Sequence, residues 1–312
     1  MGDKRWRGLL GPPSLVISTA LVIAAVVPAA LAAGPLRPPP ASSLPCPSAG
    51  LLVDGGLGAA GGTSSNARVT SETALTPRGE ETGRRLAVGL GSTELAAISL
   101  PAESFVAGPF GDVLIYGWHT PVAGSDVRAL ALASGCDERL AQPQGVVRSA
   151  VLDPAGRALY VHAVAEEDRR DLGVVRHDLE TGQHSQVVEP LPASERFGPT
   201  FATSLHWSLG GGELAVQSCG FSLCRTRVLD TMSGSVESFG TATHGALVGL
   251  DSQALYAFDA CHWSPCDLLA IERGTGTARV VAEEAYEATL RAGSGGSLIT
   301  LTTPAGSLEV AP

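Results

Sequence analysis

The chain has 312 residues, with 21 Lys or Arg and 31 Asp or Glu, which gives a formal net charge of −10 at pH 7. An acidic surface argues against nucleic acid as a partner, because phosphate binding needs clustered cations. Lys4 is the only lysine, so a chain that has lost its first segment cannot supply a P-loop lysine, a Schiff base or a Ser-Lys dyad.

The first 33 residues predict an export signal. Lys4, Arg5 and Arg7 precede an uncharged, apolar run from Ser14 to Ala33, and Ala30-Leu31-Ala32 supplies the small residues of a cleavage site. The run is also long enough, at about 20 residues, to cross a bilayer. Residues 1–33 are therefore a signal peptide or an N-terminal membrane anchor that attaches the chain through residues 14–33. In both cases the body of the protein is predicted to be extracytoplasmic, either secreted or membrane-anchored.

Residues 34–66 predict an extended tether, because the segment is rich in proline and glycine and has no apolar period. From residue 67 to residue 312 the chain consists of short apolar runs broken by turns, which predicts an all-β domain. Two landmarks recur in it. A Gly- or Asp-containing turn precedes an apolar run at 110–118, 153–164, 209–219, 250–261 and 293–303, and a Ser/Thr-Gly turn ends at Gly135, Gly182, Gly234 and Gly276.

The spacing of these landmarks predicts a β-propeller. The Ser/Thr-Gly turn returns at intervals of roughly 40 to 50 residues, which is the period of a four-stranded blade. One blade cannot bury both of its faces alone, whereas blades stacked around an axis cover one another. Runs such as "ALYVHAV" (158–164) are apolar at consecutive positions, as a strand buried on both faces requires. We expect a single propeller of six blades, with five as the alternative.

The same repeats resemble those of TolB-like and Trp-Asp-type β-propellers. "VLDPAGRALYVHAV" followed by "VVRHDLETG", and "HWSLGGGELAVQS" followed by "RTRVLDTMSG", are similar to repeats in which a Ser-Pro-Asp-Gly turn precedes the second strand and a Thr-Gly turn follows the third. The turns are degenerate, with Asp153-Pro-Ala-Gly156 the nearest to the pattern. The resemblance implies the architecture and leaves the function open, since propellers host enzymes, binding proteins and scaffolds.

The six cysteines predict disulfides. Cys219 and Cys224, and Cys261 and Cys266, each bracket the loop between a second and a third strand, where facing residues are close enough to be bridged. Export favours their oxidation. The C-x4-C spacing departs from the usual zinc signature, so zinc and a redox-active pair are the less favoured alternatives. The remaining two, Cys46 and Cys136, are candidates for a third bridge.

Candidate ligand contacts follow from the resemblance. It implies that second-to-third strand loops share a face with the connections between blades, and that ligands bind there. Residues in or near these loops are Trp118, His119, His162, His262 and Trp263. For His162, which lies within an apolar run, and for the tryptophans, burial in the core is the favoured interpretation and ligand contact is the alternative. The charged run "AEEDRRD" (165–171) is interpreted as a solvated loop.

These features favour an exported, non-catalytic propeller that binds a protein, peptide or glycan through its loop face, without a cofactor or metal. The alternative is an enzyme with a histidine- or carboxylate-lined central channel that could be metal-dependent. No H-E-x-x-H or G-x-S-x-G motif occurs in the sequence, which makes catalysis the weaker hypothesis. A structural envelope component held by an uncleaved N-terminal helix is the third.

Overall fold

The computed structural model describes residues 67–75, 81–90, 93–101, 103–110, 113–131, 137–192, 198–220, 224–239, 244–259, 265–293 and 296–312. All regular elements in these ranges are β-strands, which confirms the all-β class. The described part of the chain contains no helix that is long and apolar enough to cross a membrane. The segment predicted as signal or anchor (1–33) and the predicted tether (34–66) lie outside the described residues.

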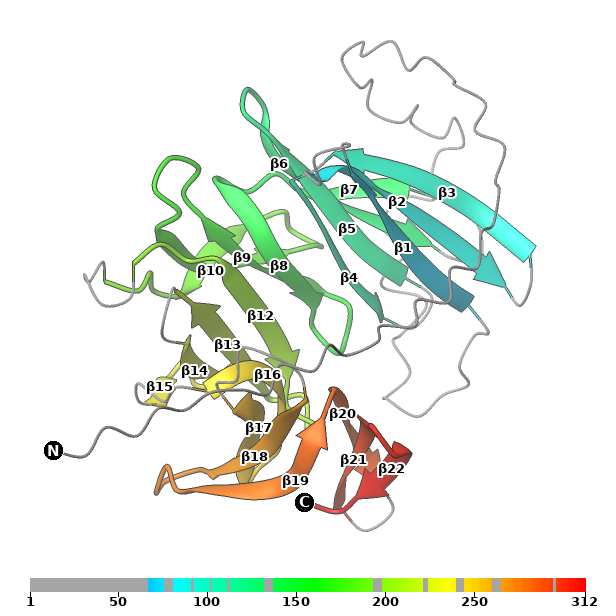
Figure 1. Ribbon diagram of the computed structural model, residues 1–312. Coiled ribbons are helices and arrows are strands. Elements are labelled where there is room, and N and C mark those ends of the chain that lie inside the picture. Colours follow the sequence, from blue (N-terminus) through cyan, green and yellow to red (C-terminus); the bar gives the residue numbers. More distant parts are fainter. Residues whose placement is uncertain are drawn as a thin grey trace, which may run out of the picture. The chain divides into compact units, whose positions relative to one another are not determined.

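The strands form six antiparallel sheets, in each of which neighbours in sequence are neighbours in space (Figure 1). The first sheet contains β1 (Ala67–Leu75), β2 (Glu81–Leu90) and β3 (Thr93–Pro101). The second contains β4 (Ser104–Phe110), β5 (Val113–Thr120), β6 (Gly124–Ala131) and β7 (Asp137–Ala141). The third contains β8 (Val146–Leu152), β9 (Ala158–Val164), β10 (Asp171–Asp178) and β11 (His184–Val188).

The fourth sheet contains β12 (Ala202–Trp207), β13 (Glu213–Cys219), β14 (Cys224–Asp230) and β15 (Val236–Phe239). The fifth contains β16 (His244–Leu250), β17 (Ala254–Asp259), β18 (Cys266–Glu272) and β19 (Ala278–Ala285). The sixth contains β20 (Glu287–Gly293), β21 (Gly296–Thr303) and β22 (Gly306–Val310). The prediction of four-stranded units is thus confirmed for the second to fifth sheets.

The second strand of each of these sheets is buried on both faces. In β9 every residue is buried, and alternate side chains enter different cores because successive residues of a strand point to opposite faces. Leu159 and Val161 pack against the second sheet, whereas Ala158 and Tyr160 pack against the fourth. The same division occurs in β5, β13 and β17. Each sheet therefore shares an apolar core with the next one along the chain.

The first strands bring consecutive sheets together. β4 contacts β8, β8 contacts β12, β12 contacts β16, and β16 contacts β20. This succession of first-strand contacts is the arrangement that a propeller requires, in which the first strand of each blade lies innermost.

The Ser/Thr-Gly landmarks form one repeated turn. At the first copy, Asp178 N donates to the carbonyl of Gln183 (2.8 Å) and Gly182 N donates to that of Asp178 (2.9 Å). The copies that end at Gly234 and Gly276 have the equivalent bonds. The three glycines have φ between 70° and 74°, a left-handed conformation that costs other residues about 1–2 kcal/mol. The glycine repeat in the sequence is thus explained by backbone geometry; Gly135 lies outside the described residues.

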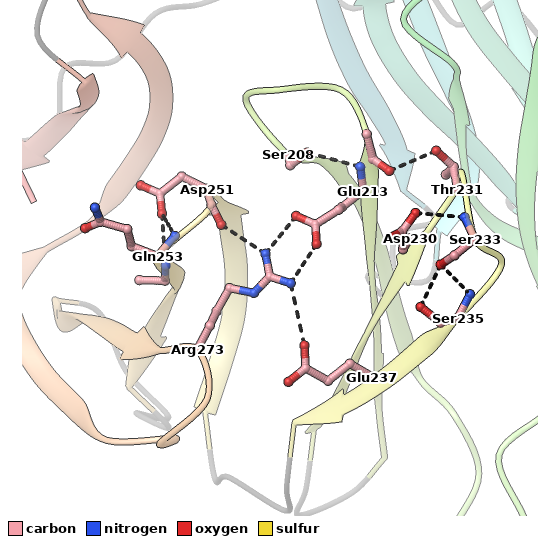
Figure 2. Close-up of polar contacts among 12 residues, drawn as sticks. Ser208, Glu213, Asp230, Thr231, Ser233, Ser235, Glu237, Asp251, Gln253 and Arg273 are labelled. Atoms are coloured by element: carbon pink, nitrogen blue, oxygen red, sulfur yellow. Dashed lines mark hydrogen bonds and ion pairs between the residues drawn. The ribbon is translucent and has the colours of Figure 1, made fainter.

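A polar cluster near these turns joins the fourth and fifth sheets. Figure 2 shows Arg273, in the turn after β18, donating to both carboxylate oxygens of Glu213 on β13, at 2.7 and 2.6 Å. The second guanidinium nitrogen also lies 3.5 Å from Glu237 on β15. Arg273 and Glu213 are mostly buried, whereas the side chain of Glu237 is 51% exposed. A paired, two-pronged contact of this kind is stronger than an exposed ion pair.

A double-mutant cycle on Arg273→Ala and Glu213→Ala is therefore expected to show a coupling free energy of about 1 kcal/mol in urea unfolding. The matched cycle on Arg273→Ala and Glu237→Ala is expected to give less than about 0.5 kcal/mol, because that contact is longer and more exposed. Equal coupling in the two cycles would contradict this assignment.

The predicted disulfide between Cys219 and Cys224 is present. The two cysteines face one another at the ends of β13 and β14. Cys266 is also disulfide-bonded; its predicted partner Cys261 lies outside the described residues, as do Cys46 and Cys136.

Replacing Cys219 and Cys224 together by serine is expected to lower the free energy of unfolding by about 2 kcal/mol, because the bridge closes a short loop in the unfolded chain. The check is the urea midpoint of the variant against that of the oxidised wild type. No change in midpoint would show that the hairpin is held by its strand pairing alone.

Candidate functional site

The candidate site is a groove between the second and third sheets. A cavity of about 640 Å³ is bounded by the turn after β5, the connection from β7 to β8 and the loop from β9 to β10. These are second-to-third strand loops and a connection between sheets, as the predicted loop face requires. We call this cavity the His119 groove, after the buried side chain that lines it.

One hydrogen bond orients the ring of His119, and it goes to a Ser125 hydroxyl that two further hydrogen bonds hold in place. The Ser125 hydroxyl donates to the carbonyl of Gly145 (2.7 Å) and accepts from the backbone N–H of Val147 (3.1 Å). The single hydroxyl hydrogen of Ser125 is used in the bond to Gly145, so toward any further partner this oxygen can only accept. Nδ1 of His119 lies 3.2 Å from the Ser125 oxygen. In this network Nδ1 therefore carries the hydrogen, and in the neutral ring Nε2 carries a lone pair.

That lone pair faces a carboxylate. Nε2 of His119 lies 3.3 Å from Oε2 of Glu166, which stands on the β9–β10 loop and also lines the groove. The histidine side chain is only 4% exposed and that of Glu166 is 46% exposed. Nε2 is buried and makes no hydrogen bond. When the ring is neutral, the groove thus holds two acceptors side by side, Nε2 of His119 and Oε2 of Glu166.

The surroundings of this pair are acidic. Glu166, Glu167 and Asp168 are exposed in succession on the β9–β10 loop, and Arg170 is the basic residue that lines the same groove, with its Nε 3.7 Å from Asp168. The neighbouring Arg169 is directed elsewhere, since its guanidinium donates to Glu103 (2.6 Å). The formal charge of the lining is therefore negative.

The loop is held in a conformation that is unusual for its sequence. Arg169 has φ = 55°, which costs a non-glycine residue about 1–2 kcal/mol. Its backbone N–H donates to Ala165 (3.1 Å), its carbonyl accepts from Thr200 (2.9 Å), and its side chain reaches Glu103. Backbone strain of this kind is concentrated at functional sites. Here the strained residue belongs to the loop that carries the acidic lining residues Glu166, Glu167 and Asp168.

The groove also offers apolar surface. Val122 lies at its rim, fully exposed, and Pro143 and Leu172 contribute to the lining. Gln142 donates through its side-chain amide to the carbonyl of Ala123 (2.9 Å). The site therefore combines oriented acceptors, negative charge and a small apolar surface.

A second group of chemically active residues is sealed in the interior. His162 and Ser218 are 0% exposed and Asp171 is 2% exposed. Nε2 of His162 lies 2.6 Å from Asp171 and 3.4 Å from the Ser218 oxygen. A catalytic triad needs the serine and the carboxylate on different ring nitrogens, whereas here both address Nε2 and Nδ1 has no hydrogen-bond partner. This geometry does not activate a nucleophile.

The buried group instead joins the third and fourth sheets. Asp171 on β10 accepts from the backbone N–H groups of Gly173 (3.1 Å) and Leu191 (2.8 Å) and from Arg227 on β14 (3.1 Å). Burial alone would raise the pKa of Asp171, but its hydrogen bonds and the charges of His162 and Arg227 lower that pKa to about 2. The Asp171 carboxylate is therefore ionised in the folded protein at neutral pH.

The predicted ligand contacts are thus separated. His119 lies in the groove, whereas His162 is fully buried and its Nε2 contacts Asp171. Trp118 packs into the core between the first and second sheets, with its ring 6.2 Å from that of Tyr116. His262 and Trp263 lie outside the described residues. Among the described residues no group of three or more His, Cys, Asp or Glu is arranged to hold a metal ion.

Two residues of the groove were missed by the sequence analysis. Glu166 belongs to the run 165–171, which was interpreted only as a solvated loop, and Ser125 drew no attention. The signal available for Glu166 was its place in a second-to-third strand loop next to the one that follows His119.

Comparison with known proteins supports the fold. No protein-family model matches the sequence, and no curated protein matches it. Among solved structures, hydrazine synthase from Kuenenia stuttgartiensis is similar with a TM-score of 0.51 and 11% identity over 77% of this chain and 82% of that one. TolB from Acinetobacter baumannii has a TM-score of 0.45 and 13% identity, over 78% of this chain and 65% of the TolB chain.

The β-propeller domain of the Trilobed protease from Pyrococcus furiosus has a TM-score of 0.43 and 11% identity, over 66% of this chain and 70% of that one. This chain spans less than two thirds of the length of the TolB chain and 45% of the length of an acylaminoacyl peptidase from Pyrococcus horikoshii. At these identities the likeness is one of fold alone.

Proposed function

We propose that the protein is an exported, non-catalytic propeller that binds a protein, peptide or glycan through the His119 groove. The observation that carries the proposal is the groove itself, about 640 Å³ in volume and lined by hydrogen-bonding groups and apolar surface on the loop side of two sheets. A concave site of this size with a few oriented polar groups is the usual form of a binding pocket.

Binding is favoured over catalysis because of where the chemically active residues lie. The Ser218–His162–Asp171 group is inaccessible and serves to join two sheets. The groove contains an oriented histidine and a carboxylate, a pair that suits recognition of a hydrogen-bond donor.

Six blades and an extracytoplasmic location complete the proposal. Six described sheets with first-strand contacts from the second to the sixth support six blades, of which the first and last have three described strands. The Cys219–Cys224 bridge supports an oxidising compartment. Whether residues 14–33 are cleaved or anchor the chain is tested by the intact mass of the protein from an export host.

The binding proposal is tested by filling the groove. Protein purified from an export host is screened against a random peptide library and a glycan array, together with Ala123→Trp, which places an indole in the groove, and Met232→Trp. Met232 is 91% exposed in the turn after β14 and provides the matched control. We expect probes that bind the wild type and Met232→Trp and are lost with Ala123→Trp. Absence of any retained probe, or equal retention by all three proteins, would overturn the proposal.

A further inference from the structure

We propose that the His119 groove recognises a positively charged side chain, arginine or lysine, of a protein or peptide, and that this cation pairs with Glu166, the exposed carboxylate that faces Nε2 of His119. The inference rests on the proposed binding function and names the chemical class of its ligand.

The first argument is the unsatisfied acceptor pair. The Ser125 oxygen accepts a hydrogen bond from Nδ1–H of His119, so in the neutral ring Nε2 can only accept. Glu166 carries no hydrogen when ionised. Two acceptors 3.3 Å apart repel one another, and the buried Nε2 has no hydrogen-bond partner. A polar atom left in this state costs about 1–3 kcal/mol, so a cation that donates to the exposed Glu166 offsets the repulsion within the pair when it binds.

Both ammonium and guanidinium groups meet that requirement. Each presents several N–H donors and no acceptor, and hydrogen bonds to an ionised partner are about twice as strong as neutral ones.

The second argument is the negative charge of the residues that line the groove. Glu166, Glu167 and Asp168 face solvent around the groove, while Arg169 is engaged by Glu103 and only Arg170 offsets them among the lining residues. The resulting negative potential attracts cations and raises their association rate. It disfavours anionic glycans and acidic peptides, and a neutral glycan gains nothing from it.

The third argument is the apolar surface beside the acceptors. Val122, Pro143 and Leu172 line the same cavity, and the exposed valine has no structural role in the core. Arginine and lysine carry apolar stems that pack along such surface while their charged ends reach polar partners. The groove thus matches both parts of a basic side chain.

The test uses peptides that differ only in charge. Acetylated and amidated Gly-Arg-Gly and Gly-Lys-Gly are titrated into the full protein by calorimetry, beside the same peptides with citrulline or acetyl-lysine, which keep the shape and lose the charge. We expect the charged peptides to bind at least about tenfold more tightly than their neutral counterparts, the effect of a hydrogen bond to a charged group.

The variant arm isolates the carboxylate. Glu166→Gln keeps the side-chain size at an exposed position, so folding is not at issue, and it is expected to weaken binding of the charged peptides roughly tenfold. Glu180→Gln, at an exposed position in the β10–β11 turn, changes the net charge equally and is expected to leave affinity unchanged. Equal losses in the two variants would reduce the effect to net charge and overturn the inference.

The two proposals fail differently. One outcome is that neutral peptides or glycans bind, that Ala123→Trp abolishes this binding, and that the arginine and lysine peptides do not bind. The cation inference is then wrong and the binding function stands. If Ala123→Trp changes no binding at all, the groove is not the site and both proposals fall.

Discussion

Replacing Asp171 by alanine is expected to lower the free energy of unfolding by about 3–5 kcal/mol, or to prevent folding at physiological temperature. The carboxylate accepts two backbone N–H groups and Arg227 and lies against His162, all in the interior between the third and fourth sheets. Its removal leaves a buried guanidinium without its charge partner and the backbone N–H of Leu191 without an acceptor. Stranded buried charge is the largest of these costs.

A double variant separates this explanation from a simple cavity. Arg227→Met in the Asp171→Ala background removes the stranded charge, so the double variant is expected to be less destabilised than the sum of the single variants by about 1–3 kcal/mol. Denaturant midpoints of the three proteins give the comparison. Additive effects would show that Asp171 and Arg227 do not act as one unit.

The same carboxylate predicts an acid dependence. Its pKa is lowered from 3.8 to about 2 in the folded protein, so the folded state binds this proton less readily than the unfolded state. The stabilisation is therefore present above about pH 4 and is lost as the pH falls toward 2, by about 2 kcal/mol. Asp171→Asn is expected to lack this component.

Replacing Gly173 by alanine is expected to cost about 3 kcal/mol or more, the sum of a conformational and a steric effect. Gly173 has φ = +73°, and a Cβ there would lie 2.1 Å from the carbonyl oxygen of Val188 and 2.6 Å from the amide of Gln186. The oxygen belongs to the paired strand β11 and cannot move without breaking that pairing.

Gly182 provides the matched control in the same sheet. Its φ is +70°, and a Cβ there would meet nothing within 4 Å. Gly182→Ala is therefore expected to cost only about 1 kcal/mol, the conformational part alone. The check is the difference between the two midpoints in urea, and equal midpoints would mean that β11 yields to the added methyl group.

The sheets could be predicted from the sequence because the signals for them are local. The Ser/Thr-Gly turn is recognised from a glycine at φ > 0, and a strand buried on both faces is recognised from a continuous apolar run such as 158–164. The order of the strands within each sheet can therefore be read from each repeat by itself. The number of blades could not be settled in this way, because it depends on how the first and last sheets meet, and residues before Ala67 are not described by the structure.

The site could be predicted only in part, because its chemistry depends on contacts between distant segments. His119 was identified from its place at a loop, but the hydrogen on its ring is decided by Ser125, Gly145 and Val147, which come from three positions along the chain. His162 lies within the apolar run 158–164, which favours burial, and Asp171 and Ser218 contact its ring from two sheets.

The most direct test of the proposed recognition is the imidazole nitrogen NMR spectrum of ¹⁵N-histidine-labelled protein, with His119 assigned by loss of its signals in His119→Gln. At a pH where the ring is neutral, the account predicts hydrogen on Nδ1 and a free lone pair on Nε2, whose resonance moves when the arginine tripeptide is added and stays in place with the citrulline tripeptide. Hydrogen on Nε2, or an Nε2 resonance that does not respond to the arginine tripeptide, would contradict it.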